Sequence, residues 1–365
     1  MESERAAQAL ERAEMMGLDG LALMPGPNLR YLTGLSFVIS ERPIVVFLPI
    51  DAEPCAVVPE FEAARMQAIG LQTFGYSDEE GYALAFHEAC VHLELADTRL
   101  GVEALRMRLL EARALMRYAP GVELVPADDL YAELRSIKSV AELNAMERAV
   151  RVAESAFSQW VTQLRVGVTE REAAGQLVAL LLTGGADGLA FDPIVASGPN
   201  GALPHAVPGD RPLREGDWVV VDWGVTVDGY ASDLTRVLVV GEPGGPLARA
   251  HELVVAANEA ACRVVAPGTL AEAVDEAARS VIENYHYGEY FTHRTGHGLG
   301  LEAHESPNIV AGNRQVLQPG MTFTIEPGIY LPGVGGIRIE DDVVVTSQGG
   351  MRLSALPHAP FVIQA

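Results

Sequence analysis

The sequence has little positive charge and lacks any long uncharged apolar run. Lysine and arginine number 26 against 49 aspartates and glutamates, which gives a net charge of −23. Nucleic-acid binding needs a basic surface, so this balance excludes nucleic acid as a partner. No uncharged apolar run approaches the ~18 residues that a membrane span requires. We therefore expect a soluble protein with a solvated acidic surface and no nucleic-acid or membrane partner.

Cysteine is also scarce. Only three occur, far apart and with no CxxC pair: Cys55, Cys90 and Cys262. Such isolated cysteines are typical of a reducing compartment, where each is a small buried apolar residue. The first residues, MESERAAQALERAE, are acidic and polar and do not match a secretory signal peptide. These features predict a cytoplasmic protein.

What is present is a globular composition, with 49% hydrophobic and 21% charged residues, in a chain of 365 residues that is long enough for two domains. In the first third, short apolar segments alternate with helical ones, which indicates α/β layers. We expect strands at 21–24, 44–48, 56–58, 100–102 and 122–125, helices at 3–16, 60–69, 82–95 and 104–118, and a turn at PGPN (25–28). This domain, at residues 1–132, carries no catalytic motif. A second domain, at residues 133–365, is expected to open with a long helix at 140–164.

The second domain contains a weak internal repeat. Thr169-Glu170-Arg171-Glu172 and Thr269-Leu270-Ala271-Glu272 lie one hundred positions apart, and both fit the capping box of a helix start. Each is preceded by another predicted helix and followed by an apolar strand carrying an acid. Asp222 and Glu326 then occupy equivalent places, and so do Asp233 and Glu340 on the next strands. Chance similarity between short apolar strands is the alternative. Two duplicated halves would build one site at their interface.

Hairpin geometry supports one such site. Asp228-Gly229 between apolar runs predicts a two-residue turn, which pairs Val227 with Tyr230 and, counting outward, Asp222 with Thr235. Side chains alternate faces along a strand, so Asp222 and Asp233 should project from the same face as diagonal neighbours. Their Cα atoms would lie ~7–8 Å apart, within reach of a shared ligand.

Four acids in apolar strands need compensation, because a lone buried carboxylate is costly. Arginine pairing is one alternative, and Arg236 and Arg338 are the candidates, but two cations do not neutralise four acids. Metal binding is the other, with His297 of the glycine-rich FTHRTGHGLGLEAHE as a fifth ligand. Two divalent ions balance four carboxylates. Oxygen-rich ligation with one imidazole favours Mn²⁺ and permits Zn²⁺, Co²⁺ or Fe²⁺.

Four motifs resemble the creatinase/aminopeptidase, or pita-bread, metallopeptidases, specifically their Xaa-Pro dipeptidase (prolidase) and Xaa-Pro aminopeptidase branch. They are VVDWGVTVDGYASDLTR (220–236), THRTGHGLGLEAHESP (292–307), TIEPGIY (324–330) and GIRIEDDVVVT (336–346). The resemblance implies a creatinase-like α/β N-terminal domain and a pita-bread α+β catalytic domain with a pseudo-two-fold repeat. It also implies that the five metal ligands are Asp222, Asp233, His297, Glu326 and Glu340.

The same resemblance implies further site residues. His205 and His304 match pocket histidines, expected to bind substrate and stabilise the oxyanion. His293 and Arg338 match residues that bind substrate or support the site. Glu326, besides binding metal, is expected to carry the proton to the departing proline nitrogen.

The implied function is two-metal hydrolysis of the Xaa-Pro bond in small peptides with proline at the second position, with dipeptidase favoured. Xaa-Pro aminopeptidase activity on longer peptides is the alternative within the family. Methionine aminopeptidase does not need the additional N-terminal domain, and creatinase lacks this metal set. A non-catalytic pita-bread module that binds peptides or histones is the alternative from another class. The resemblance also implies a homodimer formed through the N-terminal domain.

Overall fold

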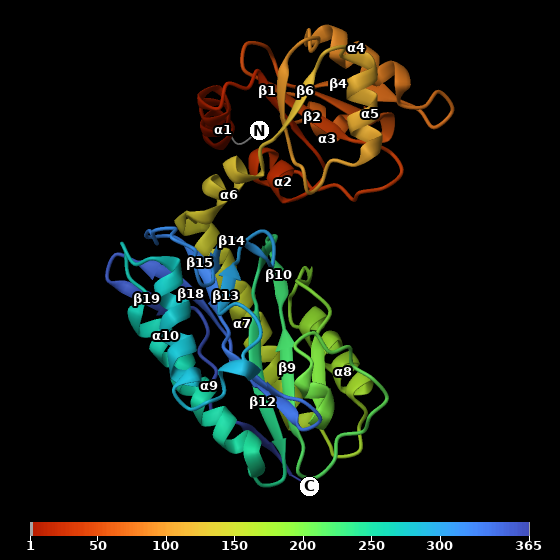
Figure 1. Cartoon of the computed structure of the whole chain (residues 1–365). Coiled ribbons are helices and arrows are strands. Elements are labelled where there is room, and N and C mark those ends of the chain that lie inside the picture. The colour runs from red at the N-terminus through yellow and green to blue at the C-terminus, as the bar shows by residue number, and fades with distance from the viewer. Residues whose placement is uncertain (1–2, 365) are drawn as a thin grey trace. The chain divides into compact units, whose positions relative to one another are not determined.

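The computed structural model describes residues 3–364, which divide into two compact units, one ending at Arg135 and the other beginning at Ser136 (Figure 1). No helix in these residues is long and apolar enough to cross a bilayer.

The first unit is a mixed six-stranded sheet in the order β4-β3-β2-β1-β5-β6. Strand β1 pairs antiparallel with β2 and parallel with β5, and β2 pairs antiparallel with β3. The outer pairs β3–β4 and β5–β6 are parallel. Its elements are α1 (Ser3–Met15), β1 (Gly20–Leu23), α2 (Pro27–Thr33), β2 (Val45–Pro49), β3 (Cys55–Pro59), α3 (Glu60–Gln67), β4 (Gln72–Tyr76), α4 (Ala83–His92), β5 (Arg99–Val102), α5 (Leu109–Tyr118), β6 (Glu123–Pro126) and α6 (Asp128–Ser136).

Two local predictions in this unit are wrong. PGPN does not remain a turn, because Pro27 begins helix α2, and proline is favoured at a helix start, where its missing N–H leaves no bond unmade. The helix expected at 104–118 begins only at Leu109. Residues before it form a turn in which the Met107 N–H donates to the Glu103 carbonyl at 2.7 Å.

Glu103 at this turn is fully buried. Its carboxylate accepts hydrogen bonds from the Met24 N–H at 2.6 Å and from Asn28 Nδ2 at 2.7 Å. Burial, partly offset by these bonds, raises the pKa of Glu103 to about 7. The Glu103 carboxyl therefore links β1 and α2 to the end of β5. Its ionised form is costly to bury, so this link destabilises the unit more as the pH rises.

The second unit contains two main sheets, in the orders β20-β12-β9-β8 and β14-β13-β15-β18-β19. Its helices are α7 (Val140–Gln163), α8 (Glu170–Thr183), α9 (Gly245–Val264) and α10 (Ala271–Glu283). The strands that matter for the site are β8 (Ile194–Ser197), β9 (Trp218–Trp223), β10 (Val225–Val227), β11 (Tyr230–Ala231), β12 (Leu234–Val240), β13 (Gly296–Gly298), β14 (Glu305–Ile309), β15 (Thr322–Ile325), β16 (Gly328–Leu331), β17 (Gly335–Arg338) and β18 (Asp341–Thr346). The short β7 (Gly188–Leu189), β19 (Gly349–Arg352) and β20 (Phe361–Ile363) complete the sheets.

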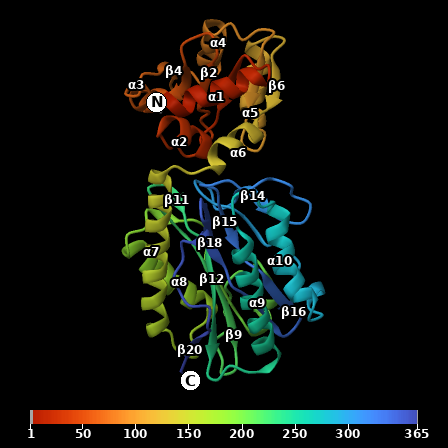
Figure 2. The ribbon, with the colours of Figure 1, turned by 90° about the vertical axis from the view of Figure 1, so that its left-hand side faces the viewer.

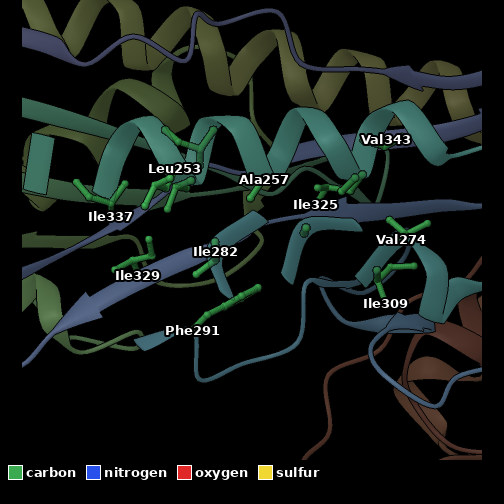
Figure 3. Close-up of a cluster of buried hydrophobic side chains, with 14 of the residues drawn as sticks. Leu253, Ala257, Val274, Ile282, Phe291, Ile309, Ile325, Ile329, Ile337 and Val343 are labelled. Atoms are coloured by element: carbon green, nitrogen blue, oxygen red, sulfur yellow. The ribbon is translucent and has the colours of Figure 1, made fainter. Parts of the chain in front are cut away.

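Two hydrophobic cores lie on the opposite faces of β9 and β12, between the helix pairs. Alternate residues of β9 enter them: Val219, Val221 and Trp223 pack with α7 and α8, whereas Trp218 and Val220 pack with α9. Figure 2 shows α7 and α9 on opposite sides of these strands. Figure 3 shows the second core, where Leu253 and Ala257 of α9 meet isoleucines of β15, β16 and β17. Because both faces of these strands are covered by apolar side chains, polar groups can cluster only at the strand ends.

The internal repeat predicted from the sequence is visible in the pairing. Isolated bridges Thr169↔Pro212 and Leu270↔Val316 occur at equivalent places, just before α8 and α10. In each half a central strand pairs antiparallel with a strand on either side, β9 with β8 and β12, and β15 with β13 and β18.

Only one of the two expected capping boxes forms. Thr169 caps α8 with Glu172. Helix α10 instead begins after Leu270, so Glu272 falls one position too early in its first turn, and the Thr269 hydroxyl donates to the Val264 carbonyl at 3.0 Å.

Candidate metal centre

The hairpin after β9 has the register that the sequence predicts. Val227 pairs with Tyr230, and Asp222 pairs with Thr235. Asp228 and Gly229 have φ angles of 51° and 82°, as a type I′ turn requires. Asp222 and Asp233 both line one cavity.

Asp233, Glu326 and Glu340 are not within strands, contrary to the expectation, and Glu326 directly follows the last residue of β15. Asp233 lies in the break between β11 and β12, and Glu340 in the break between β17 and β18. The Asp233 N–H donates to Asp342 Oδ2 at 3.1 Å instead of to a neighbouring strand. Because Asp233 and Glu340 lie in these breaks, their side chains need not follow the alternation between the two faces of the sheet.

A direct link joins the two halves at Glu340. Thr235 of β12 forms an isolated bridge with Glu340, whose N–H donates to the Thr235 carbonyl at 3.1 Å. The Thr235 hydroxyl donates to Glu340 Oε2 at 2.6 Å. A carboxylate of the second half is therefore held in place by a strand of the first.

His297 is positioned by the glycines on either side of it. A Cβ atom on Gly296 would lie 1.8 Å from the Thr324 carbonyl oxygen, and one on Gly298 would lie 2.2 Å from the Ser306 carbonyl oxygen, so only glycine fits between β14 and β15. His297 Nδ1 lies 3.1 Å from the Gly298 carbonyl. A proton on Nδ1 leaves the Nε2 lone pair free for a cation.

The five expected ligands converge. His297 Nε2 lies 3.2 Å from Glu326 Oε1 and 3.7 Å from Asp233 Oδ2. Three overlapping groups have ligand atoms within 4.8 Å of one another: Asp222–Asp233–Glu340, His297–Glu326–Glu340 and Asp233–His297–His304. Each group could hold a metal ion. His304 belongs to the third group, so it lies close to the ligand set.

The electrostatics of these acids fit bound cations. Burial raises the pKa of Asp222 and raises those of Asp233 and Glu340 well above their usual range, with neighbouring carboxylates adding to the effect. Burial has the largest single effect on Glu326 and acts to raise its pKa, but the hydrogen bond and charge of His297, together with the charges of His293 and Arg338, outweigh it and lower the pKa to about 2. Asp222 Oδ1 is buried without a hydrogen-bond partner. Such an oxygen-rich donor set, with one acceptor unsatisfied, suits divalent cations.

Arginine pairing compensates only one of these acids. Arg338 Nη2 donates to Asp222 Oδ2 at 2.6 Å. Arg236, the other candidate, forms an ion pair with Asp341 at 2.8 Å instead. Among the described residues, arginines therefore do not neutralise all four carboxylates, and the alternative of arginine pairing is not supported.

Tyr330 is a site residue for which the sequence reasoning had no assignment, although it ends the motif TIEPGIY. Its hydroxyl accepts a hydrogen bond from Arg338 Nη1 at 2.8 Å and lies 2.8 Å from His293 Nε2. Tyr330 thereby links the two expected supporting residues. Burial lowers the pKa of His293, which favours the neutral ring.

The site cavity has a volume of about 800 Å³. Exposed His205 and His304 line it, and the His304 ring stands edge-on to His297 with centroids 4.1 Å apart. Burial and the neighbouring cationic groups lower the pKa of His304 to about 4, so the ring is neutral at pH 7. The walls also include Phe191, Pro193, Val207 and Pro208, which lie outside the four motifs, and Arg294 and Ala303, which lie within 292–307 but had no assigned role.

The two units of the chain match two different protein families. Residues 144–347 match metallopeptidase family M24, and residues 4–137 match the creatinase/prolidase N-terminal domain. A probable dipeptidase PepE of Mycobacterium tuberculosis is 39% identical, over 99% of this chain and 96% of its own length. The Xaa-Pro dipeptidase of Pyrococcus horikoshii is 35% identical, over 96% and 97%. The crystal structure of a prolidase from Thermococcus sibiricus superposes with a TM-score of 0.95 at 36% identity, covering 100% of this chain and 99% of that one. These matches confirm the fold class expected from the motifs.

Proposed function

Because the chain belongs to metallopeptidase family M24, and is thus an enzyme with the creatinase and pita-bread folds, we propose that it is an Xaa-Pro dipeptidase. The observation that carries this proposal is the convergence of four carboxylates and His297 on one cavity. The names of the relatives in the preceding comparison support the substrate class.

We propose that two divalent cations, preferably Mn²⁺, are held by Asp222, Asp233, His297, Glu326 and Glu340. Zn²⁺, Co²⁺ and Fe²⁺ are compatible with the same donors. When bound, such ions polarise a carbonyl oxygen and lower the pKa of water, which makes a nucleophile available at neutral pH. The protein's part is to hold, orient and desolvate the substrate and to move protons.

His304 and His205 are the proposed donors to the oxyanion that develops on the scissile carbonyl. A neutral histidine has one N–H to donate, and the low pKa of His304 keeps it neutral at working pH. Removing one such donor typically lowers kcat by about 10²–10³-fold. Glu326 is the proposed proton carrier to the leaving nitrogen, and His293 Nδ1 lies 3.9 Å from its Oε2.

Proline must be selected by shape, because the nitrogen of its amide carries no N–H to be recognised. Phe191, Pro193, Val207 and Pro208 give the cavity an apolar wall that suits a pyrrolidine ring. Arg338, held by Asp222 and Tyr330, is the proposed support for the substrate and the site.

The cytoplasmic location remains part of the proposal and is supported by three free cysteines. A homodimer is proposed from family membership, and sedimentation of the purified protein tests it. Neither point affects the chemistry at the centre.

The test uses metal-stripped protein reloaded with Mn²⁺ and three substrates, Ala-Pro, Ala-Pro-Ala and Ala-Ala. Metal-dependent release of proline from Ala-Pro, with Ala-Ala uncleaved, is the expected result. Faster cleavage of Ala-Pro-Ala would assign the protein as an Xaa-Pro aminopeptidase. Failure to cleave any of the three with metal bound would contradict the enzyme proposal and favour a peptide-binding module.

A further inference from the structure

A buried ion pair lies next to His304, at the start of β14, and has no part in the chemistry proposed above. Lys138 Nζ lies 2.5 Å from Glu305 Oε1, and the two side chains are 1% and 7% exposed. The residues are 167 positions apart in the chain. Burying two full charges is expensive, so a pair of this kind contributes more to fixing one arrangement than to stability.

The backbone of Lys138 is fixed on both sides. Its N–H donates to the Gly320 carbonyl at 2.9 Å, and Ile137 before it forms a bridge with Met321. Ser139 after it caps α7 in a capping box with Glu142. The backbone of Lys138 is therefore held between the start of β15 and the start of α7.

Glu305 opens β14 directly after His304 and pairs with Gly298 of β13. Residues between these strands fold closely over the ion pair. A Cβ atom on Gly300 would lie 2.4 Å from Glu305 Oε1 and 2.9 Å from Lys138 Cε. The ion pair thus occupies the space around which the 299–304 loop turns.

His304 depends on this loop for its place. Within residues 3–364 its ring makes no hydrogen bond, and its side chain is exposed to the cavity. Its contact with His297 is edge-on, which alone is a weak constraint. The ring is therefore oriented chiefly by its backbone, which Glu305 anchors one residue away.

We propose that Lys138 and Glu305 are positioning residues, which hold the 299–304 loop so that His304 points at the reacting carbonyl. The proposal rests on the oxyanion role assigned to His304 under the proposed function. Catalytic groups need their geometry fixed to within a fraction of an ångström, and a buried charge-assisted bond to an anchored lysine supplies such a constraint.

The test replaces both members, as Lys138→Met with Glu305→Gln, because removing one alone would take away the opposite charge that faces the other in a buried site and would destabilise the fold. We expect kcat for Ala-Pro to fall about 10–100-fold, less than the loss of an oxyanion donor itself, with KM and bound Mn²⁺ nearly unchanged. In a His304→Ala background the same replacement should change kcat by less than about threefold, because coupled residues are non-additive. A general structural defect would instead lower both backgrounds equally.

A second measurement does not depend on turnover. Hydrogen exchange of the 299–304 amides should speed up at least about tenfold in the double variant, while exchange in β15 stays as in the wild type. The control is Arg211→Met with Asp217→Asn, an ion pair of the same unit at 2.6 Å whose residues do not line the cavity; it should leave the loop unchanged. Wild-type exchange in the loop, or equal kcat losses with and without His304, would overturn the positioning role. If Xaa-Pro substrates are not cleaved at all, the proposed function fails, and exchange still decides the positioning role.

Discussion

Metal-dependent stabilisation of the second unit gives the sharpest test of the centre. Ligands that bind only the folded state stabilise it by about 2.7 kcal/mol per site at a hundredfold excess over Kd. Two sites would add about 5 kcal/mol, and at 2–4 °C per kcal/mol for a unit of this size the melting temperature should rise by about 10–20 °C. Differential scanning calorimetry of chelated and Mn²⁺-loaded protein measures this rise.

Asp233→Asn should remove most of that increase, because Asp233 belongs to two of the three ligand groups. The metal-free variant should not be less stable than the metal-free wild type, since the change deletes a charge that burial and nearby acids disfavour. The matched control is Asp217→Asn, a buried acid paired with Arg211, which should keep the full metal response. Our reasoning is refuted if Asp233→Asn melts with the wild-type response to Mn²⁺.

Four further predictions follow from single residues. His304→Ala should lower kcat for Ala-Pro by about 10²–10³-fold while metal analysis finds both ions still bound, and an unchanged kcat would exclude its role as a donor. Gly296→Ala places a Cβ atom 1.8 Å from the Thr324 carbonyl oxygen, so urea titration should show a loss of about 1–3 kcal/mol or more together with reduced metal binding; wild-type stability would contradict the close approach. Phe157→Ala removes a fully buried ring stacked in the core of the second unit and should cost about 3–5 kcal/mol without altering the metal stoichiometry. For Glu103, a folded pKa of about 7 against an ordinary 4.5 means that stability is present below pH 4.5 and is lost as the pH rises to 7. Glu103→Gln should therefore gain up to about 3 kcal/mol relative to wild type over that range in urea titrations, and a pH-independent difference would refute the shift.

Local chemistry made part of the fold predictable. The Asp228-Gly229 turn fixed the register of its hairpin because two positive φ angles suit few other pairs. A proline that begins a helix and a proline in a turn look alike over four residues, which is why α2 was missed at Pro27. The capping box at Thr269 failed because a shift of one residue in the helix start changes which positions can pair.

The acidic residues of the candidate site could be predicted from the sequence, but the hydrogen bonds that hold them could not. Acids in apolar strands stand out in a sequence because their burial needs a reason. The contacts that hold these acids in place cannot be recognised in the sequence. The Thr235–Glu340 hydrogen bond joins residues 105 positions apart, and Tyr330 connects His293 to Arg338 through ordinary hydrogen bonds. Such contacts depend on how the two halves pack, which local patterns do not encode.

The Thr235–Glu340 bridge has a consequence for the order of folding. Two of the three ligand groups among the described residues, Asp222–Asp233–Glu340 and Asp233–His297–His304, take members from both halves, so a cation can bind at either only after the two halves have met. Closing such long loops carries an entropic penalty and is slow compared with forming a helix or a hairpin. We therefore expect full metal loading of this chain to follow the packing of the two halves, and bound metal to stabilise that packing.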